Sequence, residues 1–343
     1  MTINKQDVTS ITILGAGAFG FAMAHVLSNN NPNIHITLFD IQEAAIKHIQ
    51  DTKEHLFFHK GIKLPSNVSA TTNLDEAINN KAPQIILLAV PSKFARSAFN
   101  NLNGKIPQNT IFLNVAKGLE PKTNNSIQEI LNQELGQDQS PYHYATLSGG
   151  MIASEVTANA PLGADIACQD INVANLLKEL TQNQFLKIRT STDTVGTQLA
   201  GALKNVIAIG AGIIDSNLKE SSKSGYISAI SVEMQLLAIK LGAKQETFEA
   251  GSYAWWGDLM TTCFGASRNL EFGRRVGKPQ NQQTPEDILK QMYEEKKSVE
   301  GYNTIKAVYD LLIKNQIHAP ITTALYQTLF ENKPTEEFIN NCM

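Results

Sequence analysis

The sequence predicts an α/β fold in two parts, a doubly wound parallel sheet in residues 1–190 and an all-helical domain in residues 191–343. Short apolar or β-branched runs alternate with helical patterns as far as Thr190, which is the pattern of right-handed β-α-β units. Beyond Thr190 the apolar residues recur at helical spacing and no run resembles a strand. A glycine-rich turn follows the first predicted strand, at the edge where such sheets bind ligands.

The N-terminal strands are predicted from short runs of apolar and β-branched residues. We expect them at residues 10–14, 35–39, 68–71, 84–90, 110–115 and 143–147. The run at residues 84–90 is apolar throughout, which is typical of a strand covered on both faces. Helices are expected at residues 18–27 and 41–50, and a loop-rich stretch at residues 56–66.

The C-terminal helices are predicted from apolar residues spaced three and four apart. We expect them at residues 199–214, 227–241, 246–263, 285–296, 304–314 and 322–331. The serine-rich stretch from Lys219 to Gly225 has the composition of a loop. The apolar character of this helical domain leads us to expect a homodimer.

Composition excludes several classes of protein. Lysine and arginine total 29 against 32 aspartate and glutamate residues, a net charge of −3, so we expect no nucleic-acid partner. The most apolar stretch, residues 199–214, contains Lys204 and is shorter than the roughly 20 residues of a membrane span, so we expect no membrane insertion. Residues 1–20 lack a signal-peptide pattern. Three widely spaced cysteines form neither a CxxC metal motif nor a disulfide framework, so we expect a cytoplasmic protein without a metal site.

The sequence GAGAFG fits the G-x-G-x-x-G pattern of a dinucleotide-binding turn. Gly15, Gly17 and Gly20 permit a tight turn, close approach to a pyrophosphate and close packing of helix on strand. Ala18 and Phe19 begin the helix whose N-terminus would receive the phosphates. Because a strand precedes the motif and a helix follows it, we expect a Rossmann-type sheet that binds NAD; the alternative is a glycine turn that only packs.

Asp40 lies 20 residues beyond the last glycine, at the end of the second predicted strand. A carboxylate there accepts hydrogen bonds from the adenosine ribose and repels a 2′-phosphate. Ile41 and Gln42 supply no arginine that would bind such a phosphate. We therefore expect NAD as the preferred cofactor, with NADP possible; the alternative is that Asp40 is only a solvated strand end.

Two turns are predicted at the carboxyl edge of the sheet, where ligands bind. Lys117 follows the strand at residues 110–115, and Pro91 lies in the turn after residues 84–90. Either turn could face the cofactor. The alternatives are a solvated loop lysine and an ordinary strand-terminating turn.

Lys204 interrupts a nearly all-apolar helix. Its neighbours on the same face include Ala200, Gly201, Ala208 and Ala211, whose small side chains leave a groove for a ligand or another backbone. Desolvation lowers the pKa of a lysine, which makes it a usable general base. The alternatives are a lysine that reaches to solvent along the apolar surface and one in a structural ion pair.

A third group of polar residues follows Trp255 and Trp256. Asp258 lies in an apolar helical pattern and needs a partner, for which Lys204 is the candidate. Arg268 and Asn269 offer the donors that a phosphate monoester accepts. Cys263 is expected to be a small buried residue rather than a nucleophile, because nothing near it in the sequence would activate a thiol.

From about Ile11 to Tyr326 the chain resembles the bacterial NAD(P)-dependent glycerol-3-phosphate dehydrogenase family. The resemblance rests on seven motifs in order: GAGAFG, VPS at 90–92, AKGLE at 116–120, LSG…A.EV at 147–156, LAGALKNVIAIGAGIID at 199–215, GDL..TC…SRN at 257–269 and VEGYNT at 299–304. It implies reversible hydride transfer between sn-glycerol 3-phosphate and dihydroxyacetone phosphate. The physiological direction would be reduction, which supplies glycerol phosphate for phospholipid synthesis.

The resemblance also implies roles for individual residues. Lys204 matches the catalytic lysine that exchanges the proton of the C2 hydroxyl, Asp258 the aspartate that orients it, and Lys117 the lysine that bridges cofactor and substrate. The remaining matches are to substrate-binding positions at Gly149, Ser267, Arg268 and Asn269, and to positions near the cofactor at Ala153 and Glu300. Together with the residue-based candidates above, the expected cofactor-binding residues are Gly15, Gly17, Ala18, Phe19, Gly20, Asp40, Pro91, Lys117, Ala153, Arg268 and Glu300.

Three departures from the family pattern are expected to surround the active site and to affect rate and substrate fit. Met151 replaces a hydroxyl residue expected on the substrate, residues 216–233 are rewritten, and Trp255 and Trp256 replace a Gly-Leu pair. Two other functions therefore stay open at this point. One is a dehydrogenase of a different phosphorylated alcohol or hydroxy acid, and the other is a weakly catalytic NAD-binding sensor.

Overall fold

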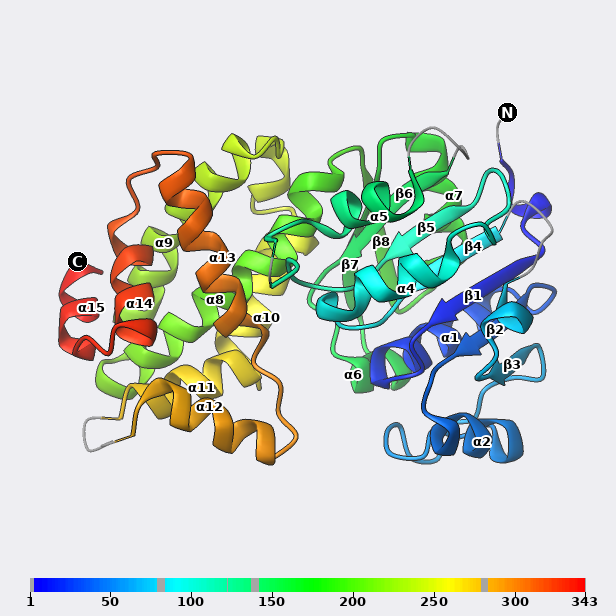
Figure 1. Ribbon diagram of the computed structural model, residues 1–343, viewed down its shortest axis with the longest axis horizontal. Coiled ribbons are helices and arrows are strands. Elements are labelled where there is room, and N and C mark those ends of the chain that lie inside the picture. Colours follow the sequence, from blue (N-terminus) through cyan, green and yellow to red (C-terminus); the bar gives the residue numbers. More distant parts are fainter. Residues whose placement is uncertain (1–2, 79–83, 122, 137–141, 279–282, 343) are drawn as a thin grey trace.

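A computed structural model describes residues 3–78, 84–121, 123–136, 142–278 and 283–342. Figure 1 shows two parts side by side, a sheet flanked by helices and a group of helices that carries the C-terminus. The strands form one eight-stranded sheet in the order β3-β2-β1-β4-β5-β6-β7-β8. Their bounds are β1 Ser10–Leu14, β2 His35–Phe39, β3 Val68–Thr71, β4 Gln84–Leu88, β5 Ile111–Asn114, β6 His143–Ser148, β7 Leu162–Cys168 and β8 Leu186–Ser191.

Helices cover both faces of this sheet, as a doubly wound fold requires. On β1, Ile13 belongs to one buried apolar cluster and Leu14 to another, because successive side chains of a strand point to opposite faces. One cluster includes residues of α1 and α7, and the other includes residues of α4 and α5. The helices of this part are α1 Ala18–Asn30, α2 Glu43–Thr52, α3 Leu74–Ala77, α4 Ala95–Leu102, α5 Ile127–Leu135, α6 Ala153–Thr157 and α7 Ile171–Thr181.

The sheet differs from the prediction in its last two strands, β7 and β8. The strands β1 to β6 pair in parallel, but β7 runs antiparallel to β6 and parallel to β8. The sequence patterns predicted neither β7, nor α7, nor β8. Gly163 and Asp165 interrupt the apolar run of β7, and polar residues alternate along β8, so neither segment has the continuous apolar pattern of β4.

The helical part is built around α8 (Thr194–Asn217), and 20 of the 24 residues of α8 are buried. The other helices of this part are α9 Glu220–Lys240, α10 Asp258–Phe264, α11 Arg268–Val276, α12 Pro285–Glu294, α13 Glu300–Lys314, α14 Pro320–Phe330 and α15 Thr335–Asn341. By length and composition alone α8 could cross a membrane, but its apolar window lies entirely inside the protein. A helix that is apolar all round is typical of a buried core helix.

Two predictions for the helical part were wrong. The stretch from Lys219 to Gly225 is not a loop, because α9 begins at Glu220 and Lys223 is buried on its inner side. The single helix expected at residues 246–263 is divided into a short 3₁₀ turn at Gln245–Phe248, a π-helix η4 at Tyr253–Gly257 and α10. This division determines where Asp258 lies.

Candidate active site

The glycine-rich turn between β1 and α1 has the geometry that its sequence predicts. Gly15 adopts a φ of +104°, which disfavours any residue with a side chain. A Cβ on Gly20 would lie 1.9 Å from the Gly15 carbonyl oxygen, so only glycine allows the helix to approach the turn this closely. Gly17 is the N-cap of α1, and a Cβ there would meet no atom within 4 Å. The backbone at the N-terminus of α1 is therefore open to the approach of a phosphate group at this position.

Asp40 is held beside this turn. Its Oδ2 accepts a hydrogen bond from the Ala16 backbone N–H at 2.8 Å, and its Oδ1 accepts one from the Gln42 backbone N–H at 3.0 Å. Each carboxylate oxygen keeps a further lone pair for a ribose hydroxyl. The exposed Ile41 follows directly. These residues fit the adenosine half of a dinucleotide.

Two histidines that the sequence patterns did not single out hold the same turn. His55 Nε2 lies 2.8 Å from the Ala16 carbonyl oxygen, and His59 Nε2 lies 2.7 Å from the Ala18 carbonyl oxygen. His55 Nδ1 accepts from two backbone N–H groups, so Nε2 is the donor to Ala16. Burial lowers the pKa of His55, which keeps its imidazole neutral. Both residues lie at residues 56–66 or next to them, where the sequence predicted only a loop.

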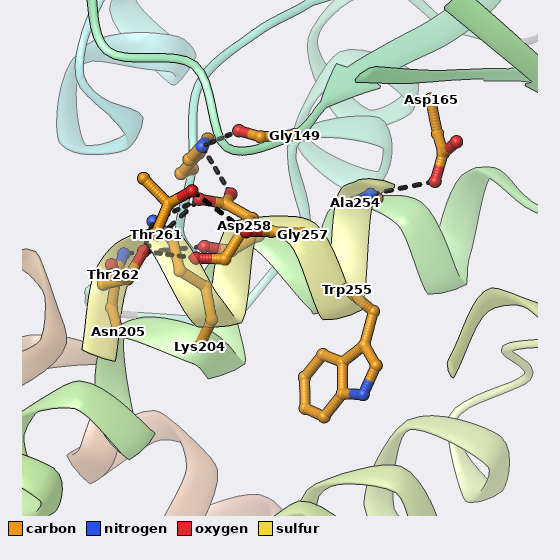
Figure 2. Close-up of polar contacts among 12 residues, drawn as sticks. Gly149, Asp165, Lys204, Asn205, Ala254, Trp255, Gly257, Asp258, Thr261 and Thr262 are labelled. Atoms are coloured by element: carbon orange, nitrogen blue, oxygen red, sulfur yellow. Dashed lines mark hydrogen bonds and ion pairs between the residues drawn. The ribbon is translucent and has the colours of Figure 1, made fainter. Parts of the chain in front are cut away.

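At the carboxyl edge of the sheet one carboxylate, that of Asp258, joins the two predicted lysines. Figure 2 shows Asp258 with Lys204 and Gly149. Asp258 Oδ2 lies 2.5 Å from Lys117 Nζ, and Asp258 Oδ1 lies 2.9 Å from Lys204 Nζ. Lys117 also donates to the Gly149 carbonyl oxygen at 2.8 Å. The contact of Lys204 with Asp258 was predicted and is confirmed. We call Lys117, Asp258 and Lys204 the lysine–aspartate cluster.

The charges of the lysine–aspartate cluster depend on one another. The Asp258 side chain is 2% exposed; burial opposes its ionisation, but Lys117 and Lys204 outweigh this effect and hold its pKa below the usual range. Burial lowers the pKa of Lys117 and the neighbouring ammonium of Lys204 lowers it further, while Asp258 counteracts both. Asp258 therefore stays ionised, and Lys117 gives up its proton more easily than a solvated lysine.

Thr262 completes the surroundings of Lys204 and was not predicted. Lys204 Nζ donates to Thr262 Oγ1 at 2.6 Å, and that hydroxyl donates to the Asp258 carbonyl oxygen at 2.6 Å. Thr262 is one helical turn beyond Asp258 on α10, so the spacing of the two residues was a usable signal. An ammonium has three N–H groups, so Lys204 keeps one for a substrate oxygen.

The segment expected to bind a phosphate lies at the start of α11. Ser267 is the N-cap and its side chain accepts from the Leu270 backbone N–H. The exposed Arg268 donates from Nη1 to Ser298 Oγ at 2.9 Å. Asn269 is buried, with Nδ2 bonded to Asn205 Oδ1 at 3.0 Å and Oδ1 bonded to the Gly301 backbone N–H at 2.9 Å. Asn269 thus ties α11 to α8 and α13 and has one amide hydrogen left for a ligand.

Three other predicted residues lie outside these contacts, and of these only Glu300 interacts with the charges of the cluster. Glu300 begins α13, and burial raises its pKa although Arg268 and both lysines of the cluster act in the opposite direction. Pro91 is exposed before a turn in which Ser92 Oγ donates to the Leu119 carbonyl oxygen at 3.3 Å. Ala153 is half-buried at the start of α6. The turn after β4 therefore touches the turn that carries Lys117.

The side chains of Met151 and Trp255, in two of the three departures from the family pattern, are buried, and the Met151 backbone N–H donates to the Gly149 carbonyl oxygen that also accepts from Lys117. Met151 is 8% exposed and lies in the apolar cluster of the N-terminal part. Trp255 is 2% exposed and packs on Phe248 with ring centroids 5.1 Å apart. Figure 2 shows its indole extending away from Asp258 and Lys204. Trp256, in contrast, is 40% exposed.

Cys263 is buried next to the cluster, and burial raises the pKa of its thiol to about 12. A thiol with this pKa stays protonated at neutral pH and is a poor nucleophile. The expectation that Cys263 is a small buried residue is confirmed.

Two family models match the chain. The model of the N-terminus of NAD-dependent glycerol-3-phosphate dehydrogenase matches residues 10–174, and the model of its C-terminus matches residues 193–340. The glycerol-3-phosphate dehydrogenase (NAD(P)+) of Clostridium perfringens is 32% identical over 338 residues, which cover 98% of this chain and 97% of that protein. The protein of the same name from Staphylococcus haemolyticus is also 32% identical, over 98% of both chains.

Solved structures agree with these matches. The crystal structure of glycerol-3-phosphate dehydrogenase from Coxiella burnetii superposes with a TM-score of 0.85 at 26% identity, over 97% of this chain and 98% of that one. The glycerol-3-phosphate dehydrogenase of Plasmodium falciparum, at 23% identity and a TM-score of 0.89 over 99% and 98% of the two chains, shares the fold. Because both halves match and the relatives align along nearly the whole length, the chain belongs to the NAD-dependent glycerol-3-phosphate dehydrogenase family.

Proposed function

We propose that this chain catalyses reversible hydride transfer between NAD(P)H and dihydroxyacetone phosphate, which gives sn-glycerol 3-phosphate. The observation that carries the proposal is the lysine–aspartate cluster: two lysines share one buried carboxylate at the carboxyl edge of a sheet whose glycine-rich turn fits a dinucleotide. The reaction needs a proton donor at the C2 oxygen and a site for a phosphate, and this edge offers both.

Lys204 is the residue that moves the proton. The nicotinamide of the bound cofactor supplies the hydride during reduction. As negative charge develops on the C2 oxygen, Lys204 Nζ donates to that oxygen the proton that is bonded neither to Asp258 nor to Thr262. In the reverse direction Lys204 accepts the proton of the C2 hydroxyl. Asp258 and Thr262 fix the direction of Nζ through the contacts at 2.9 and 2.6 Å.

Lys117 and the start of α11 hold the rest of the substrate. Lys117, fixed by Asp258 and by the Gly149 carbonyl, presents a positive charge between the substrate and the cofactor. The N-terminus of α11 and the exposed guanidinium of Arg268 provide donors and charge for the phosphate, with Ser267 and Asn269 fixing that turn. The half-buried Glu300 lies at the nicotinamide end of the cofactor.

We expect NAD to be preferred to NADP, because the carboxylate of Asp40, held beside the glycine-rich turn, would repel a 2′-phosphate bound there. The cofactor-binding residues are those of the glycine-rich turn together with Asp40, Pro91, Lys117, Ala153, Arg268 and Glu300.

A substrate panel tests the proposal. Oxidation of NADH is measured with dihydroxyacetone phosphate, dihydroxyacetone, glyceraldehyde 3-phosphate and a 2-keto acid at equal concentration. We expect dihydroxyacetone phosphate to exceed the others in kcat/KM by at least about 100-fold, because both the ketone and the phosphate have partners. A higher value for another compound supports a different dehydrogenase, and NADH binding without oxidation of any compound supports a sensor.

The cellular setting extends the proposal. The reaction runs towards glycerol phosphate in the cytoplasm and supplies phospholipid synthesis. Deletion of the gene, followed by rescue of growth with external glycerol phosphate, tests this role. We also propose that the sheet part and the helical part divide after residue 190, just before Ser191, the last residue of β8. Limited proteolysis that cuts preferentially near residue 190 supports this division.

The functional unit is a homodimer. Val232, Leu236 and Ile239 are exposed by 57%, 52% and 40% at helical spacing on α9, and an exposed apolar stripe of this kind is typical of an interface. Light scattering of the wild-type chain and of Leu236→Glu tests it. We expect a dimer that the substitution weakens, and a wild-type monomer contradicts the proposal.

A further inference from the structure

A buried carboxylate on β7 contacts the segment that carries Asp258, although it lies outside the lysine–aspartate cluster. Asp165 Oδ2 accepts hydrogen bonds from the Ala254 backbone N–H at 2.8 Å and from Ser252 Oγ at 3.0 Å. Figure 2 shows the contact with Ala254 at the beginning of the helical turn that continues to Asp258. The Asp165 side chain is 2% exposed, so its charge requires partners.

Arg189 fixes the direction of this carboxylate. It lies directly opposite Asp165 in the register of β7 and β8. Its Nε donates to Asp165 Oδ1 at 2.8 Å, and its Nη2 donates to Asp165 Oδ2 at 2.9 Å. A two-point contact between guanidinium and carboxylate sets the plane of both groups. The Asp165 oxygens therefore point from the rigid sheet towards residues 252–254.

The same strand holds the segment at a second point. Gly163 lies two residues before Asp165 and so on the same face of β7, and a Cβ there would lie 2.3 Å from the ring of Tyr253. The Tyr253 ring is therefore packed directly on the strand backbone. Ser252 Oγ, besides donating to Asp165, accepts from the Trp255 backbone N–H at 3.1 Å. The beginning of the π-helix η4 is thus set by β7.

The neighbouring strand, β6, positions the Lys117 side of the lysine–aspartate cluster. Asp165 pairs with Ser148, the last residue of β6, in the antiparallel register of β6 and β7, and Gly149 follows directly after the strand. A Cβ on Gly149 would lie 2.6 Å from the Gly163 carbonyl oxygen, so β6 and β7 are in close contact there. Gly149 supplies the carbonyl that binds Lys117. One short stretch of β7 therefore locates both Asp258 and the acceptor of Lys117.

We propose that Asp165 is a positioning residue of this enzyme, which acts through Ser252 and Ala254 to fix the π-helix so that Asp258 reaches Lys117 and Lys204 together. This inference rests on the proposed function. A π-helix is a rare arrangement that frequently occurs at functional sites, and this one is held by contacts from the sheet. Asp165 and Arg189 provide those contacts from the sheet.

The test compares two variants with a matched control. Asp165→Asn removes the charge at constant shape, and Ser252→Ala removes one hydrogen bond while leaving the Asp165–Arg189 ion pair intact. The control is Glu233→Gln. Glu233 is also a buried carboxylate with three hydrogen bonds, but it joins α9 to α14. It accepts from the backbone N–H groups of Ile321 and Thr322, both at 2.9 Å, and from the Thr322 hydroxyl at 2.6 Å.

Positioning predicts a change in kcat and in its pH dependence. We expect Asp165→Asn to lower kcat by about 10–100-fold with little change in the KM for NADH, because Asp258 is displaced from the lysines. Lys117 then loses the carboxylate that supports its charge, so the alkaline fall of kcat moves to lower pH. Ser252→Ala gives smaller changes in the same directions. Glu233→Gln lowers the unfolding temperature but retains the wild-type kcat and pH profile.

A second readout does not depend on activity. The rate at which acetic anhydride acylates Lys117, mapped by mass spectrometry, rises in Asp165→Asn and Ser252→Ala because the unprotonated amine reacts, and it is unchanged in Glu233→Gln. Wild-type kcat and wild-type Lys117 reactivity in folded Asp165→Asn or in Ser252→Ala overturn the proposal. A wild-type chain that leaves dihydroxyacetone phosphate unreduced refutes the proposed function instead, while Lys117 reactivity still decides the role of Asp165.

Discussion

Asp258 is the residue on which the electrostatics of the site depend. It is buried, and the two ammonium groups beside it hold its pKa below the usual range. The same carboxylate supports the positive charge of Lys117 against the burial that lowers the pKa of that lysine. Removing the carboxylate therefore changes the protonation of its neighbours as well as their geometry.

Asp258→Asn is expected to lower kcat by at least about 100-fold and to move its alkaline limb to lower pH, because the pKa of Lys117 falls further without the carboxylate. The measurement is kcat for dihydroxyacetone phosphate as a function of pH. Asp215→Asn is the control, since Asp215 also bridges two cations, Lys223 at 2.9 Å and Arg274 at 2.6 Å, outside the cluster. An alkaline limb that moves equally in both variants would contradict this role of Asp258.

We expect Asp40 to determine the choice between NAD and NADP. We expect the wild-type chain to have a higher kcat/KM with NADH than with NADPH. Asp40→Asn is expected to reduce that ratio by about tenfold or more, because it removes the charge that repels a 2′-phosphate. Gln42→Ala serves as the control for a neutral change next to Asp40. A wild-type preference for NADPH would refute this interpretation.

At the level of elements, the site depends on close crossings between helices. A Cβ on Gly273 of α11 would lie 1.9 Å from the Ile209 carbonyl oxygen of α8, and a Cβ on Gly212 of α8 would lie 2.2 Å from the Leu270 carbonyl oxygen of α11. Both obstacles are backbone atoms, which cannot move aside as a side chain can. The two helices therefore touch backbone to backbone, and this contact sets the position of Arg268.

Gly273→Ala is expected to destabilise the protein by about 1–3 kcal/mol through overpacking and to raise the KM for dihydroxyacetone phosphate, because α11 moves away from α8. Gly225→Ala on α9 is the matched control. A Cβ there meets no atom within 4 Å, so the substitution is expected to stabilise by about 0.5–1 kcal/mol. Urea unfolding and KM measure both effects. A destabilisation of similar size in the two variants would show that the crossing is not tight.

The elements also show what could be predicted from the sequence. The strand at Ser10–Leu14 was predicted with its observed bounds, because five consecutive residues fill both buried faces of a central strand. The strand at Leu162–Cys168 was missed because Gly163 and Asp165 interrupt its apolar run. Both residues contact the Ser252–Ala254 segment. Residues that serve a contact in the fold obscure the periodicity on which a prediction relies.

The same limit applies to the site. The pairing of Lys204 with Asp258 could be predicted, because a lysine in an apolar helix and a carboxylate in an apolar segment each require an opposite charge. The contacts of His55 and His59 with the glycine-rich turn could not, because each joins an ordinary loop residue to a backbone carbonyl. The π-helix could not be predicted either. The spacing of its apolar residues differs too little from that of a continuous α-helix to be recognised in a sequence pattern.

At the level of the whole molecule, pH affects stability through carboxylates whose pKa is lowered in the folded protein. Asp258, Asp215 and Glu271 belong to this group because cations surround each of them. A carboxylate with a lowered folded pKa contributes stability above its unfolded pKa and loses that contribution as the pH falls through the folded value. The folded state is therefore expected to weaken below about pH 4.

Urea unfolding of the wild type and of Asp258→Asn across acidic pH tests this expectation. We expect the urea midpoint of the wild type to fall steeply as the pH decreases below about 4, and the variant to lose less, because it has one fewer carboxylate to protonate. The same pH dependence in both proteins would show that Asp258 is not held in its charged form.

Substitution of Lys204 is the most direct test of the proposed mechanism, because this residue is proposed to transfer the proton to and from the C2 oxygen. We expect Lys204→Ala to bind NADH, measured by fluorescence titration, with an affinity within about threefold of the wild type, since the glycine-rich turn is untouched. In a single turnover with dihydroxyacetone phosphate the same variant is expected to oxidise NADH at least about 1,000-fold more slowly. Oxidation by Lys204→Ala at a rate near that of the wild type would contradict the assignment of the proton to this lysine.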